Sequence, residues 1–286
     1  MPELPEVETI ARGLDRRVRG ATIVSVWLGE KPEPFRSAPS VLEKTLTGSR
    51  IARVHRVGKH IVIDLEPAGS LHKREAAPAQ WLVHLGMTGR MLVAEPEAAV
   101  PPHTHAIVDL VDGRQLRFVD PRRFGRLSIA EPPAAQASAE PGKLFRGTGR
   151  EPLDISQQDF DALFRGRHTP IKSALLNQKL LHGVGNIYAD EGLFRAGIRS
   201  RRQAGRLSRA ELTRLRAGLQ AVLQEAIALG GSSVSDYVDA DGQRGFFQLE
   251  HRVYLRTGEP CHVCRTPIRR ILVAGRGTHY CPKCQK

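Results

Sequence analysis

The cysteines constrain the fold of this chain most, because all four lie within residues 261–286. They form two pairs, Cys261 with Cys264 and Cys281 with Cys284, in the order C-x2-C-x16-C-x2-C. This spacing is typical of a zinc site with four thiolate ligands, in which each pair forms a tight turn and the residues between can form a hairpin. Four thiolates leave no open coordination position, so we expect one structural Zn²⁺ ion.

Two other uses of these thiols fit less well. Two disulfides need an oxidising compartment, and the acidic N-terminus lacks the apolar core of a signal peptide that would direct the chain to one. A redox-active dithiol needs only one of the two pairs. His262 could also bind a metal, but the full set of cysteines makes it superfluous. Zinc is therefore the favoured interpretation.

The charge balance indicates a polyanionic partner. Lys and Arg number 43 against 30 Asp and Glu, which gives a formal net charge of +13 over 286 residues. This excess favours nucleic acid ahead of an anionic membrane surface, and no apolar run is long enough to span a bilayer. The length suggests two domains. We expect a cytoplasmic monomer, associated with the nucleoid of a bacterium, with no membrane partner.

Residues 21–130 carry the signals of β-strands. Apolar and polar side chains alternate strictly over residues 51–57, and Asp112-Gly113 is a strong hairpin turn between two apolar runs. Helical patterns are few in this part of the chain, so we expect a sandwich or barrel. Residues 68–79 indicate an exposed insertion, and the Pro-, Ala- and Gly-rich residues 131–149 indicate a linker.

Beyond this linker the apolar period becomes helical. The run Ser208-Arg209-Ala210-Glu211 is a capping box for a long amphipathic helix that Gly230-Gly231 ends. The polar, glycine-bearing residues 232–245 indicate a loop, and residues 246–255 a return to strand. This half of the chain is therefore expected to be mainly helical up to the cysteine array.

A glycine turn separates two further helical stretches, residues 171–181 and 187–194. The turn and the helix after it read HGVGNIYADE from His182 to Glu191. Asn186 suits the N-cap of the second helix, and the glycines would let a phosphate approach that helix end. A dinucleotide-binding turn is excluded, because no strand precedes the run and its third glycine is absent. A plain helix-turn-helix packing element fits these residues about as well.

The start Met1-Pro2-Glu3 places a potential nucleophile beside a carboxylate. Removal of Met1, which the small residue behind it permits, would leave Pro2 with a free secondary amine. Its adduct with a sugar aldehyde carbon is a cationic iminium, which is an electron sink. An α-amino group has a pKa of ~7.7–8.0, so far more of it is neutral at pH 7 than of a lysine. The apolar period over residues 7–18 predicts a helix, and an ordinary N-terminal helix is the alternative.

Five motifs occur in an order that resembles one family. They are the start Pro2-Glu3-Leu4-Pro5-Glu6-Val7-Glu8, the run His84-Leu85-Gly86-Met87-Thr88-Gly89, the run Asp120-Pro121-Arg122-Arg123-Phe124-Gly125, the turn Gly183 to Glu191, and the cysteine array. Together they closely resemble bacterial formamidopyrimidine-DNA glycosylase, the 8-oxoguanine DNA glycosylase/AP lyase family, along essentially the whole chain. The first run and the joint order are highly specific, whereas the zinc array alone is not.

The resemblance implies an α+β fold, with an N-terminal β-sandwich domain and flanking helix, then a helix-two-turn-helix domain with a β-hairpin zinc finger. The implied parts are a catalytic domain at residues 1–135, a linker at 136–149, a DNA-binding domain with a lesion loop at 150–250, and the zinc finger at 251–286. Residues 232–238 resemble that lesion loop.

The resemblance also implies an enzyme whose partner is damaged double-stranded DNA. It would excise oxidised purines, 8-oxoguanine and formamidopyrimidines, through a Schiff base on the terminal proline, and cleave the strand by β,δ-elimination. The implied catalytic residues are Pro2, Glu3, Lys59 for β-elimination and Arg276 for δ-elimination. The implied DNA contacts are His103, Arg122, Arg167 and Asn186, with Met87, Arg122 and Phe124 filling the gap left by a flipped nucleotide.

Some of these residues have ordinary alternatives when taken alone. Lys59 and Arg276 also fit solvated surface charges, and Met87 and Phe124 also fit sheet core. Two other proteins remain in view: an endonuclease VIII-like enzyme that acts on oxidised pyrimidines, and a non-catalytic zinc-ribbon DNA-binding protein. Leu4 and the loop at 232–245 argue against the first, and Pro2-Glu3 argues against the second.

Overall fold

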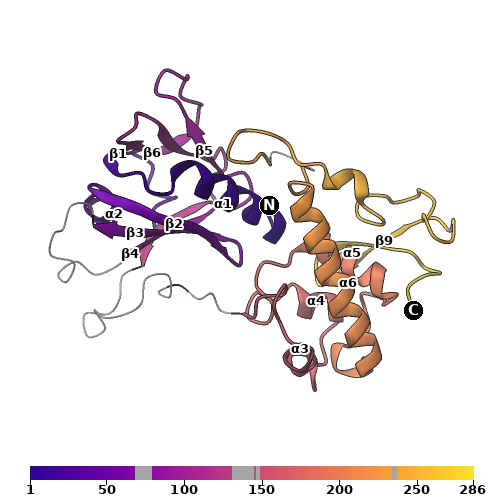
Figure 1. Ribbon diagram of the computed structural model, residues 1–286. Helices are drawn as coiled ribbons and strands as arrows, with labels where there is room; N and C mark the ends of the chain where they lie inside the picture. The colour runs from indigo at the N-terminus through magenta and orange to yellow at the C-terminus, as the bar shows by residue number, and fades with distance from the viewer. Residues whose placement is uncertain (68–78, 131–144, 146–148, 234–236) are drawn as a thin grey trace. The chain divides into compact units, whose positions relative to one another are not determined.

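The computed structural model describes residues 1–67, 79–130, 145, 149–233 and 237–286 (Figure 1). Contacts divide the chain into two compact units. The N-terminal unit comprises residues 1–2, 6–146 and 232–245, and the C-terminal unit comprises residues 3–5, 147–231 and 246–286. The expected insertion at 68–79 and linker at 131–149 lie almost entirely outside the described residues.

The N-terminal unit contains two four-stranded antiparallel sheets. One has the order β1 (Ile23–Leu28), β6 (Thr104–Leu110), β7 (Gln115–Val119), β5 (Arg90–Ala94), and the other β2 (Ser49–Val57), β3 (His60–Pro67), β4 (Ala79–His84), β8 (Arg126–Ala130). Helix α1 (Leu4–Val18) contributes Val7, Ile10 and Leu14 to the core that the two sheets share. The expected sandwich with a flanking helix is confirmed.

Local signals explain most of these elements. In β2 the side chains of Ile51 and Val54 are buried, with a register shift between them, while Arg50 and Arg53 are exposed. The Asp112-Gly113 turn joins β6 to β7 as expected, with Gly113 at φ +89°. No clear sequence pattern predicted α2 (Pro39–Leu46), β5 or β8, which are short elements of five to eight residues.

The C-terminal unit is helical up to its zinc-finger hairpin. Its elements are α3 (Gln157–Phe164), α4 (Ile171–Leu175), α5 (Asn186–Ala196), η2 (Ala204–Arg206), α6 (Arg209–Ala228), η3 (Phe247–Glu250), β9 (Arg269–Val273) and β10 (Arg276–Tyr280). The predicted capping box of α6 is present: the Ser208 hydroxyl accepts from the Glu211 amide, and the Glu211 carboxylate accepts from the Ser208 amide. None of the described helices is both long and apolar enough to cross a membrane.

Two expected elements differ from the structure. The helix expected at 171–181 ends at Leu175, because the Asn177 side chain accepts a hydrogen bond from the Lys179 amide and turns the backbone. The strand expected at 246–255 is wrong. Its first residues form η3, whose Phe247 ring is buried, and the following backbone amides bind a buried carboxylate instead of a neighbouring strand.

Candidate functional site

Glu3 lies at the N-terminal end of α5, inside the C-terminal unit. Its side chain is only 4% exposed. Its two carboxylate oxygens accept hydrogen bonds from the backbone N–H groups of Ile187 (3.1 Å) and Tyr188 (3.4 Å). These amides have no partner within the helix, and the positive end of the helix dipole stabilises an anion there. We expected this helix end to bind a phosphate. That prediction is wrong for the Ile187 and Tyr188 amides, because Glu3 already binds them.

The glycine turn before α5 leaves room for the start of the chain. A Cβ atom on Gly185 would lie 2.2 Å from Cδ of Glu3, and one on Gly183 would lie 2.9 Å from Cβ of Leu4. Gly183 also has φ +90°, and its carbonyl accepts a hydrogen bond of 3.0 Å from the Leu4 amide. Larger side chains at 183 or 185 would displace residues 3 and 4.

Asn186 does not cap α5 as expected. The N-cap is Gly185, and Asn186 is the first helical residue. The capping position needs a side-chain acceptor for the first amides, and Glu3 supplies it from a distant part of the sequence. The Asn186 amide nitrogen instead donates to the Gly277 carbonyl (3.0 Å), which lies next to Arg276 in the zinc-finger hairpin.

A buried ion pair joins α4, α5 and the same hairpin. The Nζ atom of Lys172 lies 2.7 Å from Oδ1 of Asp190, and both side chains are fully buried. Lys172 also donates to the Thr278 hydroxyl (2.8 Å) and the Gly277 carbonyl (3.0 Å), and the second Asp190 oxygen accepts from the His279 amide (2.8 Å). Burial lowers the pKa of Lys172, while the Asp190 carboxylate opposes that shift.

Glu191, the next residue of α5, holds the backbone that leads to the zinc finger. Its carboxylate is fully buried and accepts hydrogen bonds from the amides of Arg252, Val253 and Tyr254, at 2.9–3.1 Å. Burial raises the pKa of Glu191 although these three amides favour its charged form. Sequence reasoning missed Lys172, Asp190 and Glu191 as positioning residues. The one available signal was the Asp-Glu pair at the end of the motif.

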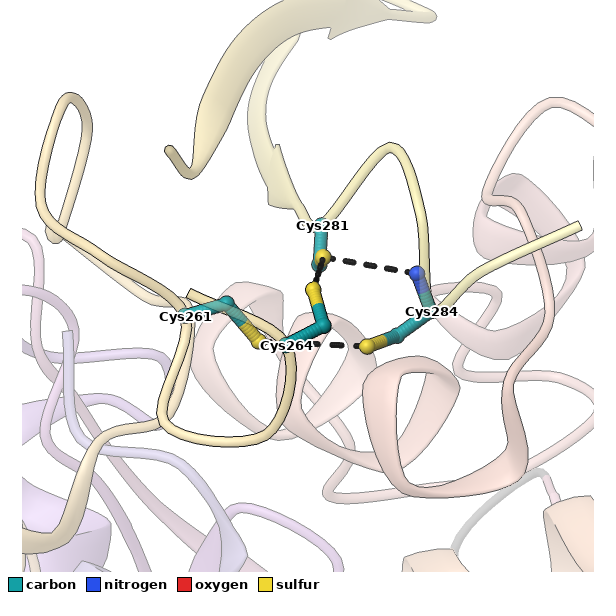
Figure 2. A group of neighbouring side chains, drawn as sticks. All are labelled: Cys261, Cys264, Cys281 and Cys284. Atoms are coloured by element: carbon teal, nitrogen blue, oxygen red, sulfur yellow. Dashed lines mark hydrogen bonds between the residues drawn. The ribbon is translucent and has the colours of Figure 1, made fainter. Parts of the chain in front are cut away.

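The four cysteines converge on one point (Figure 2). All four sulfur atoms lie within 4.8 Å of one another, with Cys261 and Cys284 at 3.9 Å and Cys264 and Cys281 at 3.4 Å. A tetrahedral site with Zn–S distances of about 2.3 Å has sulfur–sulfur edges of about 3.8 Å, whereas a disulfide needs about 2.05 Å. The geometry fits one four-coordinate zinc ion and excludes disulfides in this arrangement.

The hairpin positions Arg276 through its turn. Arg276 opens β10 directly after Ala274 and Gly275, whose φ angles are +47° and +74°, and its side chain is exposed. Arg167, after α3, is also exposed, and its backbone is close to η2, since a Cβ on Gly205 would lie 2.8 Å from its nitrogen. Helix α5 thus contacts Glu3 and the hairpin that carries Arg276, and Asn186 is its first residue. Arg167 is positioned separately, beside η2.

In the N-terminal unit, Lys59 lies in the β2–β3 turn and is almost buried. Pro2 is also buried, whereas Met1 is half-exposed. Burial, and then the positive charge of Lys59, lower the pKa of His84. The His84 ring is therefore neutral near pH 7, and its Nδ1 accepts a hydrogen bond from the Gly86 amide (3.1 Å).

Three large side chains expected to enter the DNA are exposed on this unit. Met87 is 40% exposed and Phe124 is 50% exposed, so the sheet-core alternative does not apply to them. The Arg122 guanidinium lies 4.8 Å from the centre of the Phe124 ring, a cation–π contact. His103 is exposed as well and has φ +66°.

Comparisons with known proteins give the family. Three family models match: the formamidopyrimidine-DNA glycosylase N-terminal domain over residues 1–127, its H2TH domain over residues 148–238, and a zinc finger found in FPG and IleRS over residues 258–286. A formamidopyrimidine-DNA glycosylase of Solibacter usitatus is 43% identical, and the match covers 100% of both chains. The chain belongs to the formamidopyrimidine-DNA glycosylase family. Its motifs predicted this family and its class of enzyme, a DNA glycosylase with a zinc finger, and both are confirmed.

Solved structures of the family agree with this fold. A mutant of the Lactococcus lactis Fpg protein, in complex with a Fapy-dG containing DNA, matches with a TM-score of 0.86 and 34% identity over 100% of both chains. The wild-type Lactococcus lactis protein, in complex with an oxidised-pyrimidine containing DNA, matches with a TM-score of 0.85 and 33% identity over 100% of both chains. These formamidopyrimidine-DNA glycosylases confirm the α+β class.

Removal of one zinc ligand should unfold the zinc finger. We expect Cys281→Ser to lose its zinc ion and to bind DNA more weakly, because metal binding supplies folding free energy to the hairpin that carries Arg276. Metal analysis and a DNA-binding titration measure both effects. His262→Ala is the control and should keep one zinc ion per chain. Fully active wild-type protein without zinc would contradict this role.

A methyl group at position 185 should displace Glu3. If Glu3 has the acid–base role that the resemblance implies, Gly185→Ala should lower glycosylase activity by a factor of about 10², because an acid–base group out of position loses a contribution of that order. Gly192→Ala, in the helix that Gly185 caps, is the matched control. Its Cβ would lie 3.2 Å from Cδ1 of Leu219 and 3.4 Å from its Cα, far less close than the contact at position 185, and alanine favours a helix by about 1 kcal/mol over glycine. Equal losses in both variants would argue against a special role of the Glu3 contact.

Proposed function

We propose that this chain is a bifunctional DNA-repair enzyme that excises oxidised purines from duplex DNA and cleaves the strand by β,δ-elimination. Family membership, the net charge of +13, and the Fapy-dG complex of the Lactococcus lactis relative support it. The observation that carries it is the buried carboxylate of Glu3, which two helix amides hold directly beside Pro2. A helix that served only to pack the chain would not need a buried acid at this point.

The proposed nucleophile is the nitrogen of Pro2, after loss of Met1. A base within a duplex is out of reach, so the damaged nucleotide is first turned out of the stack at a cost of a few kcal/mol. The Pro2 nitrogen then bonds to C1′, and the bond from C1′ to the base breaks. The sugar ring opens to an iminium, which acidifies the C2′ proton. Loss of that proton expels the 3′ phosphate, and a second elimination expels the 5′ phosphate.

Glu3 is the proposed proton carrier of these steps. Its carboxyl group can take up the proton that the Pro2 nitrogen loses on bonding to C1′, pass it to the sugar ring oxygen or the departing base, and take up a proton again later. The amides of Ile187 and Tyr188 fix its direction, so proton transfer does not depend on a freely rotating side chain. Lys59 and Arg276 are the proposed proton donors of β- and δ-elimination, and both also suit binding of the phosphates that flank the lesion.

The proposed grip on DNA uses both units. The backbone phosphates are bound by Arg167, Arg276 and Asn186 of the C-terminal unit and by Lys59 of the N-terminal unit. The exposure of Arg167 and Arg276 supports phosphate binding by these two arginines.

His103 and Arg122 are further proposed DNA contacts. Met87, Arg122 and Phe124 fill the gap left by the extruded nucleotide, which their exposure on one unit supports.

The remaining features of the proposal follow the family. The proposed domains are residues 1–135, 150–250 and 251–286, with a linker at 136–149. The proposed lesion loop is residues 232–238, of which 234–236 lie outside the described residues. Contacts group residues 232–245 with the N-terminal unit, so this loop is assigned to the DNA-binding domain by the resemblance alone. The protein acts as a monomer on damaged double-stranded DNA and is associated with the nucleoid. Oxidised pyrimidines are the competing substrate class, because a relative is solved with such DNA. Excision rates on 8-oxoguanine and thymine glycol duplexes would rank the two.

Borohydride should trap the protein on 8-oxoguanine DNA through Pro2. Only an iminium is reduced to a stable amine, so peptide mapping should place the adduct on the terminal residue. Pro2→Gly should impair excision, and Glu3→Gln should lower it by a factor of about 10²–10⁴, the usual contribution of acid–base catalysis. Protein that keeps Met1 is the control and should be inactive, because its Pro2 nitrogen is an amide. An adduct on Lys59 would show that the nucleophile is misassigned.

The gap-filling residues should matter for duplex DNA and little for DNA that is already open. We expect Phe124→Ala and Met87→Ala to slow excision of 8-oxoguanine from duplex far more than cleavage at a single-stranded abasic site. Arg122→Ala should also erode the preference for cytosine opposite the lesion, since such contacts give ~1–3 kcal/mol of discrimination. Single-turnover rates on both substrates and on all four opposite bases measure this.

Trp27→Ala is the matched control for Phe124→Ala. Both side chains are aromatic, 50% exposed and on the N-terminal unit, but Trp27 lies on β1. The control variant should retain its rate on both substrates. Equal losses on duplex and abasic single strand for Phe124→Ala would mean that this residue supports the fold.

A further inference from the structure

Asp120 is a fully buried carboxylate at the end of β7, and it bonds to both loops that carry the gap-filling residues. Its Oδ1 atom accepts from the Thr88 hydroxyl (2.5 Å) and the Arg122 amide (3.3 Å). Its Oδ2 atom accepts from the Gly125 amide (2.7 Å). The Thr88 hydroxyl in turn lies 3.3 Å from the Arg122 amide. One side chain therefore links the loop of Met87 to the loop of Arg122 and Phe124.

The backbone of Asp120 reaches a third DNA-contact candidate. Its amide donates to the His103 carbonyl (2.9 Å), at a residue whose backbone has φ +66°. Its own carbonyl accepts from Nε2 of His105 (3.0 Å) and from the Arg123 amide (3.3 Å). The chain segments at 84–89, 103–105 and 120–125 thus meet at this single residue.

The buried carboxylate of Asp120 depends on these loops for its hydrogen-bond donors. Among the residues that the structure describes, its carboxylate bonds to two amides and one hydroxyl, and no Lys, Arg or His side chain pairs with it. An ionised carboxylate is costly to bury unless donors surround it. Movement of either loop would remove donors from a buried charge, so the carboxylate favours one joint arrangement of both.

Glycines bring the two loops into backbone contact beside this carboxylate. A Cβ on Gly86 would lie 2.5 Å from the Phe124 carbonyl carbon, and one on Gly125 would lie 2.5 Å from Cζ of Phe118 and 3.1 Å from Oδ2 of Asp120. The loops are therefore in direct contact at these points, with no side chain of Gly86 or Gly125 between them.

We propose that Asp120 is the positioning residue that sets Met87, Arg122 and Phe124 in one arrangement for entry into the DNA, with Thr88 as its link to the first loop. This inference rests on the proposed gap-filling role of those side chains. A gap in a base stack must be filled by several groups together, and a shared anchor keeps their spacing fixed before DNA binds. Asp120 itself is fully buried, so it would act through these side chains and not on the DNA directly.

Two variants test this anchor. In Asp120→Asn the amide NH₂ must face either the Gly125 or the Arg122 N–H, so a donor opposes a donor. Thr88→Val removes only the hydroxyl at a partly exposed position, and Thr88→Ser restores it. Asp64→Asn is the matched control, because Asp64 is also a buried acid of this unit but bonds to Gln80 and His55 in the other sheet.

The readouts are single-turnover excision of 8-oxoguanine from duplex and cleavage at a single-stranded abasic site. We expect Asp120→Asn and Thr88→Val to lower the duplex rate by about tenfold or more, roughly 1.4 kcal/mol, and to leave the single-strand rate nearly unchanged. Thr88→Ser and Asp64→Asn should match the wild type on both substrates. Equal losses on both substrates, or no loss in either test variant, would overturn the inference.

Met87→Ala and Phe124→Ala, measured beside them, separate this inference from the proposed function. If these two leave duplex excision unchanged, the gap-filling role itself fails. If they impair it while Asp120→Asn and Thr88→Val do not, only the anchor fails. Coupling gives a further check: the double variant with Phe124→Ala should lose less than the product of the two single losses, because Asp120 acts partly through Phe124.

Discussion

The structure depends on the binding of the Glu3 carboxylate by the first amides of α5. This contact brings the start of the chain into the C-terminal unit, where residues 3–5 belong. Gly183 and Gly185 exist at the turn because no side chain fits beside residues 3 and 4. The same helix then presents Asp190 and Glu191, which hold the hairpin and the backbone before the zinc finger. One helix therefore orients both the proposed proton carrier and the proposed Arg276 phosphate contact.

Buried charges in this protein are better explained by position than by stability. The Lys172–Asp190 pair is completely buried, and the desolvation of such a pair commonly cancels its Coulombic attraction, so an apolar pair of similar volume is often as stable. An apolar pair could not bind the Gly277 carbonyl, the Thr278 hydroxyl and the His279 amide. Asp120 follows the same logic in the N-terminal unit, where a buried acid links loops that an apolar residue would leave unconnected.

Local patterns predicted the parts of this fold that local chemistry determines. The cysteine spacing predicted the zinc site, the alternation over residues 51–57 predicted a strand, and Ser208 with Glu211 predicted a helix start, because each signal lies within one continuous stretch of the sequence. The Asn186 cap and the strand at 246–255 failed since their outcome depends on Glu3 and Glu191, which approach from distant sequence. Lys172 could not be recognised as buried for the same reason: its partner Thr278 lies 106 residues away.

A crystal structure of the borohydride-trapped complex with 8-oxoguanine DNA tests the central claim most directly. It should show a covalent bond between the Pro2 nitrogen and C1′ of the opened sugar, with the Glu3 carboxylate still bound to the Ile187 and Tyr188 amides. A covalent bond to Lys59, or a Glu3 side chain turned away from α5, would contradict the claim that this helix end holds the proton carrier beside the nucleophile.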